Sequence, residues 1–181
     1  MNSSKTANLL MVCHNYESQG KKVLLVKPKL DTRFGSGVIK SRIGLEKVAT
    51  LDIDEKFQFI TGEPKNWEYY DICLVDEANF LTVKQIEELR ELTIWFPVIC
   101  YGLKTDYRTQ LFPASKRLLE LADQIDEVKT ICNFCNKKAI INMKFDKDHK
   151  VIKKGDDKPD LGGEEKYLGV CWSCWNHTYK F

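Results

Sequence analysis

Hydrophobic residues in the first part of the chain follow two distinct patterns. From Thr6 to Ser18 they recur at the three- and four-residue spacing of one face of a helix, and Gly20 ends this pattern. Residues 22–27 (KVLLVK) then have a continuous apolar centre, as in a strand that is covered on both faces, and Pro28 closes the strand. The chain is therefore expected to open with a helix and a buried strand, whereas the polar, glycine-bearing residues 31–50 indicate a long loop.

The alternation of strands and helices continues as far as residue 130. Residues 71–75 and 97–101 are short apolar stretches that end in polar turns, as buried strands do. Thr82 is a favoured N-cap residue ahead of apolar positions at helical spacing, Ser115–Asp123 is also helical, and Glu127–Thr130 is strand-like. Strands that alternate with helices predict an α/β fold with a parallel sheet and helices on both faces.

The pattern changes at Cys132. The residues that follow combine charged turns, short β-prone pieces and two pairs of cysteines, with too few apolar residues for a core of their own. We therefore place a domain boundary near Ile131. An α/β domain is expected over residues 1–131, and a small C-terminal domain over residues 132–181.

The composition of the 181-residue chain is that of an ordinary globular protein, with 43% hydrophobic and 30% charged residues. Its formal net charge is only +2, from 28 basic and 26 acidic side chains, which argues against a general nucleic-acid binder. The apolar stretches are far too short to span a bilayer, and the first residues do not form a signal peptide. We therefore expect a cytoplasmic protein that binds neither nucleic acid nor membranes.

The seven cysteines fall into two groups. Cys13, Cys73 and Cys100 lie in apolar stretches and are expected to be small buried residues. The other four form two Cys-x-x-Cys pairs that 35 residues separate. Four thiolates in two such knuckles suit the tetrahedral coordination of a structural Zn²⁺ ion, with redox pairs or buried thiols as the alternatives. The predicted metal ligands are Cys132, Cys135, Cys171 and Cys174.

Two short motifs in the α/β part are typical of phosphate chemistry. Ser3-Ser4-Lys5-Thr6 precedes the first helix, where backbone N–H groups hold phosphates, a lysine reaches the outer phosphates and a hydroxyl binds Mg²⁺. A helix start that is capped by serine is the alternative. Asp76 and Glu77 end a buried strand, where one acid holds Mg²⁺ and its neighbour acts on the nucleophile, unless both simply end the strand in solvent. Together these motifs predict a phosphoryl-transfer site.

Two weaker features add candidates. Asp31-x-Arg33 follows a strand, and it either brings a cation to the phosphates or forms an ion pair at the surface. Gly162-Gly163 and the nearby Tyr167 either shape a substrate loop or form a turn that leads into a strand.

These motifs belong to a pattern that covers the whole chain. It comprises MNSSKT, LDTRFGSG and SRIG in the first part, LVDEANFL and CYGLKTDYR in the centre, and KTICNFC and GGEEKY before the last cysteine pair. In this order and spacing the sequence closely resembles the type II (tetrameric, zinc-containing) thymidine kinases of bacteria. The resemblance implies a P-loop fold with a small C-terminal zinc-ribbon and lasso domain, and ATP-dependent phosphorylation of the thymidine 5′-hydroxyl group.

The resemblance also implies roles for individual residues. ATP and its Mg²⁺ would be held by residues of the first helix and of two strand ends: Asn2, Ser3, Ser4, Lys5, Thr6, Asp31 and Asp76. In catalysis, Lys5 and Arg33 would offset charge on the phosphates, and Glu77 would take the proton from the nucleoside hydroxyl group. Thymidine would be bound by apolar, aromatic and glycine positions: Met1, Phe80, Leu103, Tyr107, Gly162, Gly163 and Tyr167.

The same resemblance implies a homotetramer that uses ATP with Mg²⁺ and carries structural Zn²⁺. Ser4 stands where the family has glycine, Asn79 where many members have glutamine, and Tyr107 where many have phenylalanine. Members also carry a strand and a Gly-x pair ahead of the position of Met1, so we expect the natural protein to extend upstream of Met1. The competing interpretations are a nucleotide-binding or regulatory homologue with impaired catalysis and a zinc-ribbon nucleic-acid adaptor, which the near-neutral charge disfavours.

Overall fold

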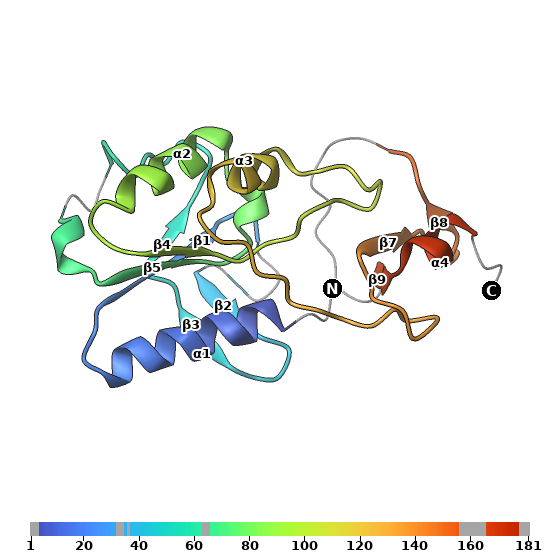
Figure 1. The fold of residues 1–181 in the computed structure, drawn as a ribbon, viewed down its shortest axis with the longest axis horizontal. Coiled ribbons are helices and arrows are strands. Elements are labelled where there is room, and N and C mark those ends of the chain that lie inside the picture. Colours follow the sequence, from blue (N-terminus) through green and yellow to red (C-terminus); the bar gives the residue numbers. More distant parts are fainter. Residues whose placement is uncertain (1–3, 32–34, 36, 63–65, 156–165, 178–181) are drawn as a thin grey trace. The chain divides into compact units, whose positions relative to one another are not determined.

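The computed structural model describes residues 4–31, 35, 37–62, 66–155 and 166–177 (Figure 1). Its internal contacts divide the chain into two units. The larger unit contains Ser4–Lys104 and Phe112–Ile125, and the smaller unit contains Thr105–Leu111 and the described residues from Asp126 onwards. The domain boundary near Ile131 stays a prediction.

The larger unit is built on a parallel sheet with helices on both faces, which confirms the predicted fold class (Figure 1). Its four strands follow the spatial order β4 (Leu51–Ile53), β1 (Val23–Pro28), β5 (Ile72–Val75) and β6 (Val98–Cys100). One face is covered by helix α1 (Lys5–Ser18), and the other face by α2 (Val83–Leu92) and α3 (Pro113–Leu121).

Side chains of β1 alternate between two hydrophobic cores, because successive residues of a strand point to opposite faces of the sheet. Leu24 and Val26 pack in the core that also contains residues of α2 and α3, whereas Leu25 packs in the core that contains α1. Leu74 of β5 also belongs to the α1 core. The residues that follow Leu25 and Leu74 at two-residue spacing, Lys27 and Asp76, therefore point to the α1 face.

Short local structures fix the start of α2 and the chain on both sides of β5. Thr82 caps α2 with a complete capping box, in which its hydroxyl accepts the Gln85 N–H and the Gln85 side chain accepts the Thr82 N–H. The 3₁₀ turn η2 (Ala78–Phe80) follows β5, and another 3₁₀ turn, η1 (Trp67–Tyr69), precedes β5. The capping box confirms the helix start predicted at Thr82.

Two parts of the secondary structure differ from the sequence prediction. The loop expected over residues 31–50 contains an antiparallel hairpin of β2 (Val38–Lys40) and β3 (Glu46–Val48), and β4 follows directly. Each of these strands has only three residues, too few for a hydrophobic period to be visible. The strand predicted at Glu127–Thr130 was wrong: among the described residues no strand pairs with these four, and all of them are exposed or half-buried.

The smaller unit contains an antiparallel sheet in the order β8 (Val151–Ile152), β7 (Ile141–Phe145) and β9 (Tyr167–Val170), followed by the short helix α4 (Trp172–Asn176). Its core joins apolar residues of β7 and β9, such as Met143 and Val170, to cysteine side chains. The interior of this unit therefore depends on sulfur atoms as well as on hydrocarbon.

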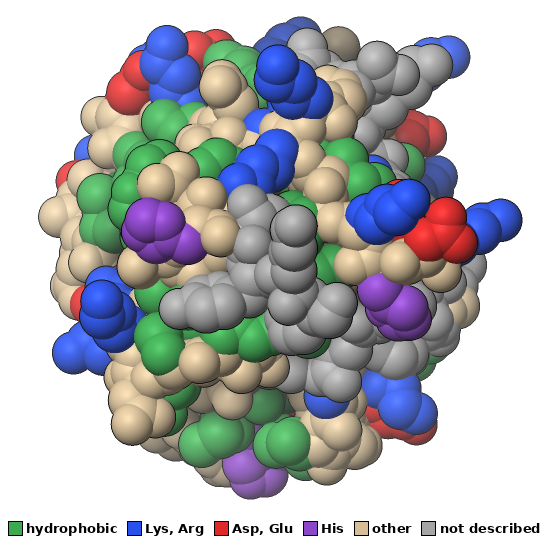
Figure 2. Space-filling view, turned by 90° about the vertical axis from the view of Figure 1, so that its right-hand side faces the viewer, with side chains coloured by type: hydrophobic (Ala, Val, Ile, Leu, Met, Phe, Trp, Pro, Cys, Tyr) green, Lys and Arg blue, Asp and Glu red, His purple; other side chains and the backbone are tan. Residues whose placement is uncertain are grey.

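Charged side chains are dispersed over the described surface. On the face drawn in Figure 2, Lys and Arg side chains stand apart from one another, and several lie beside acidic ones. Exposed pairs such as Lys40–Glu46 and Lys21–Asp71 are examples of the ion pairs on this surface. In the described parts of the chain, no helix is long and apolar enough to cross a membrane.

Candidate active site and metal centre

The start of α1 carries the residues predicted to hold phosphate. Ser4 occupies the N-cap position in the left-handed region, with φ 54° and ψ 17°, and its side chain makes no capping hydrogen bond. The alternative of an ordinary serine-capped helix is therefore wrong. Lys5 and Thr6 form the first turn of the helix, whose exposed N–H groups favour anions. Met1, Asn2 and Ser3 lie outside the described residues.

Thr6 and Asp76 are brought together although 70 residues separate them in the sequence. The Thr6 hydroxyl group lies 3.2 Å from Asp76 Oδ2 and 3.4 Å from Oδ1. Asp76 follows β5 at the carboxyl edge of the sheet, and its N–H donates to the carbonyl of Val26 on β1. The two phosphate motifs thus meet at one edge of the parallel sheet, as the sequence predicted.

Asp76 is buried, and burial is the main influence on the pKa of its carboxyl group. Burial and the charge of Glu77 raise the pKa of Asp76 from 3.8 to about 6, although Thr6 and Lys5 act in the opposite direction. A bound cation would stabilise a carboxylate whose ionised form is disfavoured in this way. Hydroxyl and carboxylate oxygens are also the donors that Mg²⁺ prefers, so Thr6 and Asp76 fit this ion.

Glu77 lies next to Asp76 in a strained backbone conformation, with φ 48° and ψ 40°. A residue other than glycine in this region costs about 1 kcal/mol or more, and such residues cluster at functional sites. Glu77 is buried as well, which excludes the alternative of two acids that end a strand in solvent. The bond from Ala78 N–H to the carbonyl of Tyr101 ties the turn after Glu77 to the end of β6.

Asp31 is buried and ion-paired with Lys27, whose Nζ lies 3.7 Å from its Oδ2. This excludes the alternative of a surface ion pair at Asp31. Arg33 lies outside the described residues. Lys27 was not among the predicted site residues, because a lysine at a strand end is usually solvated.

Two of the predicted pocket residues, Phe80 and Leu103, lie in the larger unit, and the backbone of Leu103 is held by side chains that were not predicted. The Leu103 N–H donates to Asn79 Oδ1 at 2.9 Å, and its carbonyl accepts from Ser115 Oγ at 2.6 Å. Both of these side chains are buried, so the half-buried Leu103 is held from two sides. Phe80 is also half-buried and packs edge-to-face on Phe112, with ring centroids 5.9 Å apart.

The other predicted pocket residues belong to the smaller unit. Tyr167 is buried in β9, and Tyr107 is buried beside Lys144, whose Nζ lies 4.8 Å from the centre of its ring. The Tyr107 hydroxyl lies directly against Gly155, because a Cβ atom added to that glycine would clash with it. Gly162 and Gly163 lie outside the described residues.

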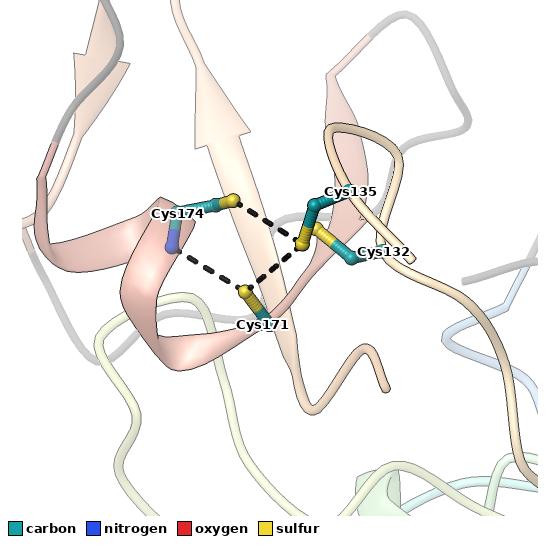
Figure 3. A group of neighbouring side chains, drawn as sticks. All are labelled: Cys132, Cys135, Cys171 and Cys174. Carbon is teal, nitrogen blue, oxygen red and sulfur yellow. Dashed lines mark hydrogen bonds between the residues drawn. The ribbon is translucent and has the colours of Figure 1, made fainter. Parts of the chain in front are cut away.

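The four paired cysteines of the smaller unit converge on one point (Figure 3). Their sulfur atoms all lie within 4.8 Å of one another, with 3.7 Å between Cys135 and Cys171 and 3.8 Å between Cys135 and Cys174. Four sulfur atoms about 2.3 Å from a tetrahedral Zn²⁺ ion lie about 3.8 Å apart. All four cysteines are free. The arrangement fits zinc, and it differs from two separate redox pairs.

Backbone N–H groups favour the thiolate form at two of these cysteines. Burial raises the pKa of Cys132, but the N–H groups of Phe134, Cys171 and Cys135 outweigh it and bring the pKa to about 7. The Cys174 N–H lies 3.4 Å from Cys171 Sγ and lowers the pKa of Cys171. Thiolates are the form that binds zinc. Among the described residues, these four cysteines are the one group of three or more His, Cys, Asp or Glu side chains that lie close enough together to hold a metal ion.

Comparisons with known proteins find similar sequences that share one description. The family model described as "Thymidine kinase" matches residues 1–175. A thymidine kinase of Chromobacterium violaceum is 40% identical over 181 aligned residues, which cover 98% of this chain and 94% of the relative. A thymidine kinase of Lactiplantibacillus plantarum is 43% identical over 173 residues, which cover 94% of this chain and 88% of the relative. One from Zymomonas mobilis is 40% identical over 174 residues, 94% of this chain and 89% of the relative.

Proposed function

The chain belongs to the thymidine kinase family, and from this premise we propose that it transfers the γ-phosphate of ATP to the 5′-hydroxyl group of thymidine. The observation that carries the proposal is the contact between the Thr6 hydroxyl and the Asp76 carboxylate, with Glu77 beside them. These residues lie at the carboxyl edge of a parallel sheet, which is where such sheets bind nucleotides.

The transfer requires positioning and charge compensation rather than covalent chemistry by the protein. Lys5 and Arg33 offset the charge on the phosphates. Thr6 and Asp76 would hold Mg²⁺, which would neutralise charge on the phosphate oxygens. Glu77 accepts the proton of the 5′-hydroxyl group as its oxygen forms a bond to the γ-phosphorus. The bond to the β-phosphate oxygen breaks, and ADP leaves.

Further residues are proposed to bind ATP and thymidine. The backbone amides of Asn2, Ser3 and Ser4 bind phosphate oxygens, and Asp31 supports the segment that approaches them. Thymidine is bound by Met1, Phe80, Leu103, Tyr107, Gly162, Gly163 and Tyr167. Specificity for the base would come from main-chain groups that pair with the pyrimidine edge, because a wrong base leaves buried polar groups unpaired.

Zn²⁺ is proposed to have a structural role in the smaller unit. Four cysteine ligands close its coordination sphere, which leaves no position for a substrate. The ion would stabilise a region whose hydrophobic core already includes Cys132, Cys171 and Cys174. The free thiols suit a reducing compartment, which supports a cytoplasmic location.

We also propose that the protein assembles as a homotetramer. Large apolar side chains are exposed at Ile43 and Val48 of the β2–β3 hairpin and at Ile94 after α2. Contacts between subunits would remove such surface from water. Light scattering coupled to gel filtration measures the assembled mass directly.

Transfer of label from γ-labelled ATP to thymidine tests the proposed activity. The purified protein is expected to form thymidine monophosphate and ADP in equal amounts, and only when ATP, thymidine and Mg²⁺ are all present. Binding of ATP without transfer would instead indicate the homologue with impaired catalysis.

Thr6 provides a matched pair of variants for this assay. Thr6→Val keeps the shape of the side chain but removes the hydroxyl group, and kcat is expected to fall about 10²-fold or more. Thr6→Ser keeps the hydroxyl group and most of the activity. Equal turnover by the two variants would contradict a role of the Thr6 hydroxyl group in phosphoryl transfer.

A further inference from the structure

The chain that follows β6 is hydrogen-bonded to the η2 turn, which begins directly after Glu77. The Ala78 N–H donates to the carbonyl of Tyr101 at 2.9 Å, and the Leu103 N–H donates to Asn79 Oδ1, also at 2.9 Å. The two bonds join consecutive residues of the turn to one short stretch of chain. All of these residues belong to the larger unit, so the contact is internal to that unit.

Gly102 lies between the two bonds and packs directly against Asn79. A Cβ atom added to Gly102 would lie 3.0 Å from Asn79 Oδ1, 3.1 Å from the Asn79 backbone nitrogen and 3.5 Å from the backbone nitrogen of Ala78. Asn79 is only 3% exposed, so other atoms surround it as well. Any side chain larger than hydrogen at Gly102 would therefore press on the η2 turn.

The amide group of Asn79 is oriented by its oxygen atom. The Leu103 N–H is a donor, so it must face Oδ1 and not the amide nitrogen. That nitrogen, Nδ2, is buried, and it has no hydrogen-bond partner among the described residues. A buried donor without a partner lowers stability. One end of the amide therefore destabilises the fold, while the other end ties the η2 turn to Leu103.

The same bonds explain how Glu77 stays in a strained conformation. Its φ of 48° and ψ of 40° lie in the left-handed region, which residues other than glycine avoid. Such a conformation persists only where the surrounding structure holds it in place. Tyr101 and Leu103 hold the chain after Glu77. The chain before it is held as well, because the Asp76 N–H donates to the carbonyl of Val26.

We propose that Asn79 is a positioning residue for phosphoryl transfer, because its bond from Leu103 holds the strained η2 turn and thereby fixes Glu77. The inference rests on the proposed function, in which Glu77 accepts the proton of the nucleoside hydroxyl group. Asn79 acts through Glu77 and touches no substrate. A misplacement of about 1 Å at a reacting group is enough to lower turnover by up to about 10²-fold.

Asn79→Leu keeps the approximate shape of the side chain and removes the acceptor oxygen. Its kcat for thymidine phosphorylation is expected to fall about tenfold or more, while KM for ATP stays within about twofold. Ser115→Ala is the matched control, because the Ser115 hydroxyl donates to the carbonyl of the same Leu103 at 2.6 Å, from α3 rather than from the η2 turn. The control is expected to keep kcat within about twofold. Equal losses of kcat in the two variants would overturn the proposal.

A second arm tests whether the effect passes through Glu77. In a Glu77→Gln background, Asn79→Leu is expected to lower kcat by less than about twofold, because the group through which it acts is already gone. A full further loss in this background would overturn the proposal, since it would show that Asn79 serves turnover by another route.

A third arm does not depend on activity, so it distinguishes this proposal from a failure of the proposed function. Glycine adopts the left-handed conformation without strain, whereas alanine does not. Glu77→Gly is therefore expected to unfold at a urea concentration about 0.3 M or more above that of Glu77→Ala. In an Asn79→Leu background the turn relaxes, and this difference is expected to vanish or to change sign, because glycine loses more conformational freedom on folding than alanine.

An undiminished difference between glycine and alanine in the Asn79→Leu background would show that Asn79 does not hold the turn. It would overturn the proposal even if no kinase activity is found. Equal urea midpoints for Glu77→Gly and Glu77→Ala in the otherwise unaltered protein would overturn it too, because the turn would then hold no strain at Glu77.

Gly102→Ala serves where Asn79→Leu does not fold. It leaves the Asn79 side chain in place and presses on it from the opposite chain, so kcat is expected to fall about threefold or more. This effect is also expected to vanish in the Glu77→Gln background. An undiminished effect there would contradict the proposal.

Discussion

Asp76→Asn is expected to make the metal-free protein more stable while it abolishes catalysis. The Asp76 carboxylate is buried beside Glu77, and the asparagine side chain has nearly the same shape but no charge. The charge that we propose serves the phosphate site therefore lowers the stability of the metal-free fold. Such a conflict between stability and activity is common at active sites.

The magnitude follows from the raised pKa of Asp76. The carboxyl group titrates near 3.8 in the unfolded chain and at about 6 in the folded chain. Between these pH values the folded state binds more protons, so the free energy of unfolding falls as the pH rises. A difference of about two pH units, at about 1.4 kcal/mol per unit, amounts to about 3 kcal/mol lost by pH 7. The Asp76→Asn protein has no ionisable group at this position, so its free energy of unfolding does not fall in this way.

Urea unfolding in EDTA at several pH values between 4 and 7.5 measures the effect. The stability gap between Asp76→Asn and the unaltered protein is expected to widen toward pH 7.5 by about 2 kcal/mol or more. Asp71→Asn is the control at the other end of β5. The Lys22 N–H and the Lys21 side chain lower the pKa of Asp71, so its ionised form stabilises the fold and the substitution should not stabilise it. Parallel pH profiles for Asp76→Asn and the unaltered protein would refute the reasoning.

Three other changes test separate parts of the molecule. Glu77→Gln keeps the shape of the proposed base, and kcat is expected to fall about 10²-fold while thymidine still binds; near-normal turnover would contradict the role. Cys132→Ser and Cys174→Ser are each expected to lose one zinc per chain by metal analysis and to loosen the smaller unit, while circular dichroism shows that the larger sheet remains. A metal-free protein with an ordered smaller unit would contradict structural zinc. Gly155→Ala should destabilise the fold by about 1–3 kcal/mol, because the new methyl group meets the Tyr107 hydroxyl, and Tyr107→Phe should restore part of the loss. No recovery in the double variant would show that the strain lies elsewhere.

The parts of the fold that the sequence predicts are those in which a pattern extends over several residues. Helix α1 shows its apolar face over 14 residues, and β1 and β5 are short continuous apolar stretches between polar turns. Because β1 and β5 are parallel neighbours, their carboxyl ends lie at one edge of the sheet. The contact between Thr6 and Asp76 follows from this arrangement, and so was predictable from two motifs 70 residues apart.

Features that depend on partners from elsewhere in the chain could not be predicted. A three-residue strand such as β4 is too short to show a hydrophobic period. It forms a strand because it pairs with β1 at the edge of the sheet. Glu127–Thr130 has a strand-like composition but no such edge. The burial of Lys27 depends on carbonyl groups of Gly35 and Val38, and these meet the ammonium group only after the β2–β3 hairpin has formed.

The left-handed backbone at Ser4 has a consequence for how this site is found in other sequences. The Ser4 side chain is exposed and makes no capping hydrogen bond. The structure therefore constrains the backbone dihedral angles at this position but not the chemistry of the side chain. Glycine adopts these angles without strain, and serine adopts them at a modest energetic cost. A sequence motif that requires glycine at this position would not match this chain. A motif that is written in backbone angles would include it, and would admit asparagine or aspartate there before any β-branched residue.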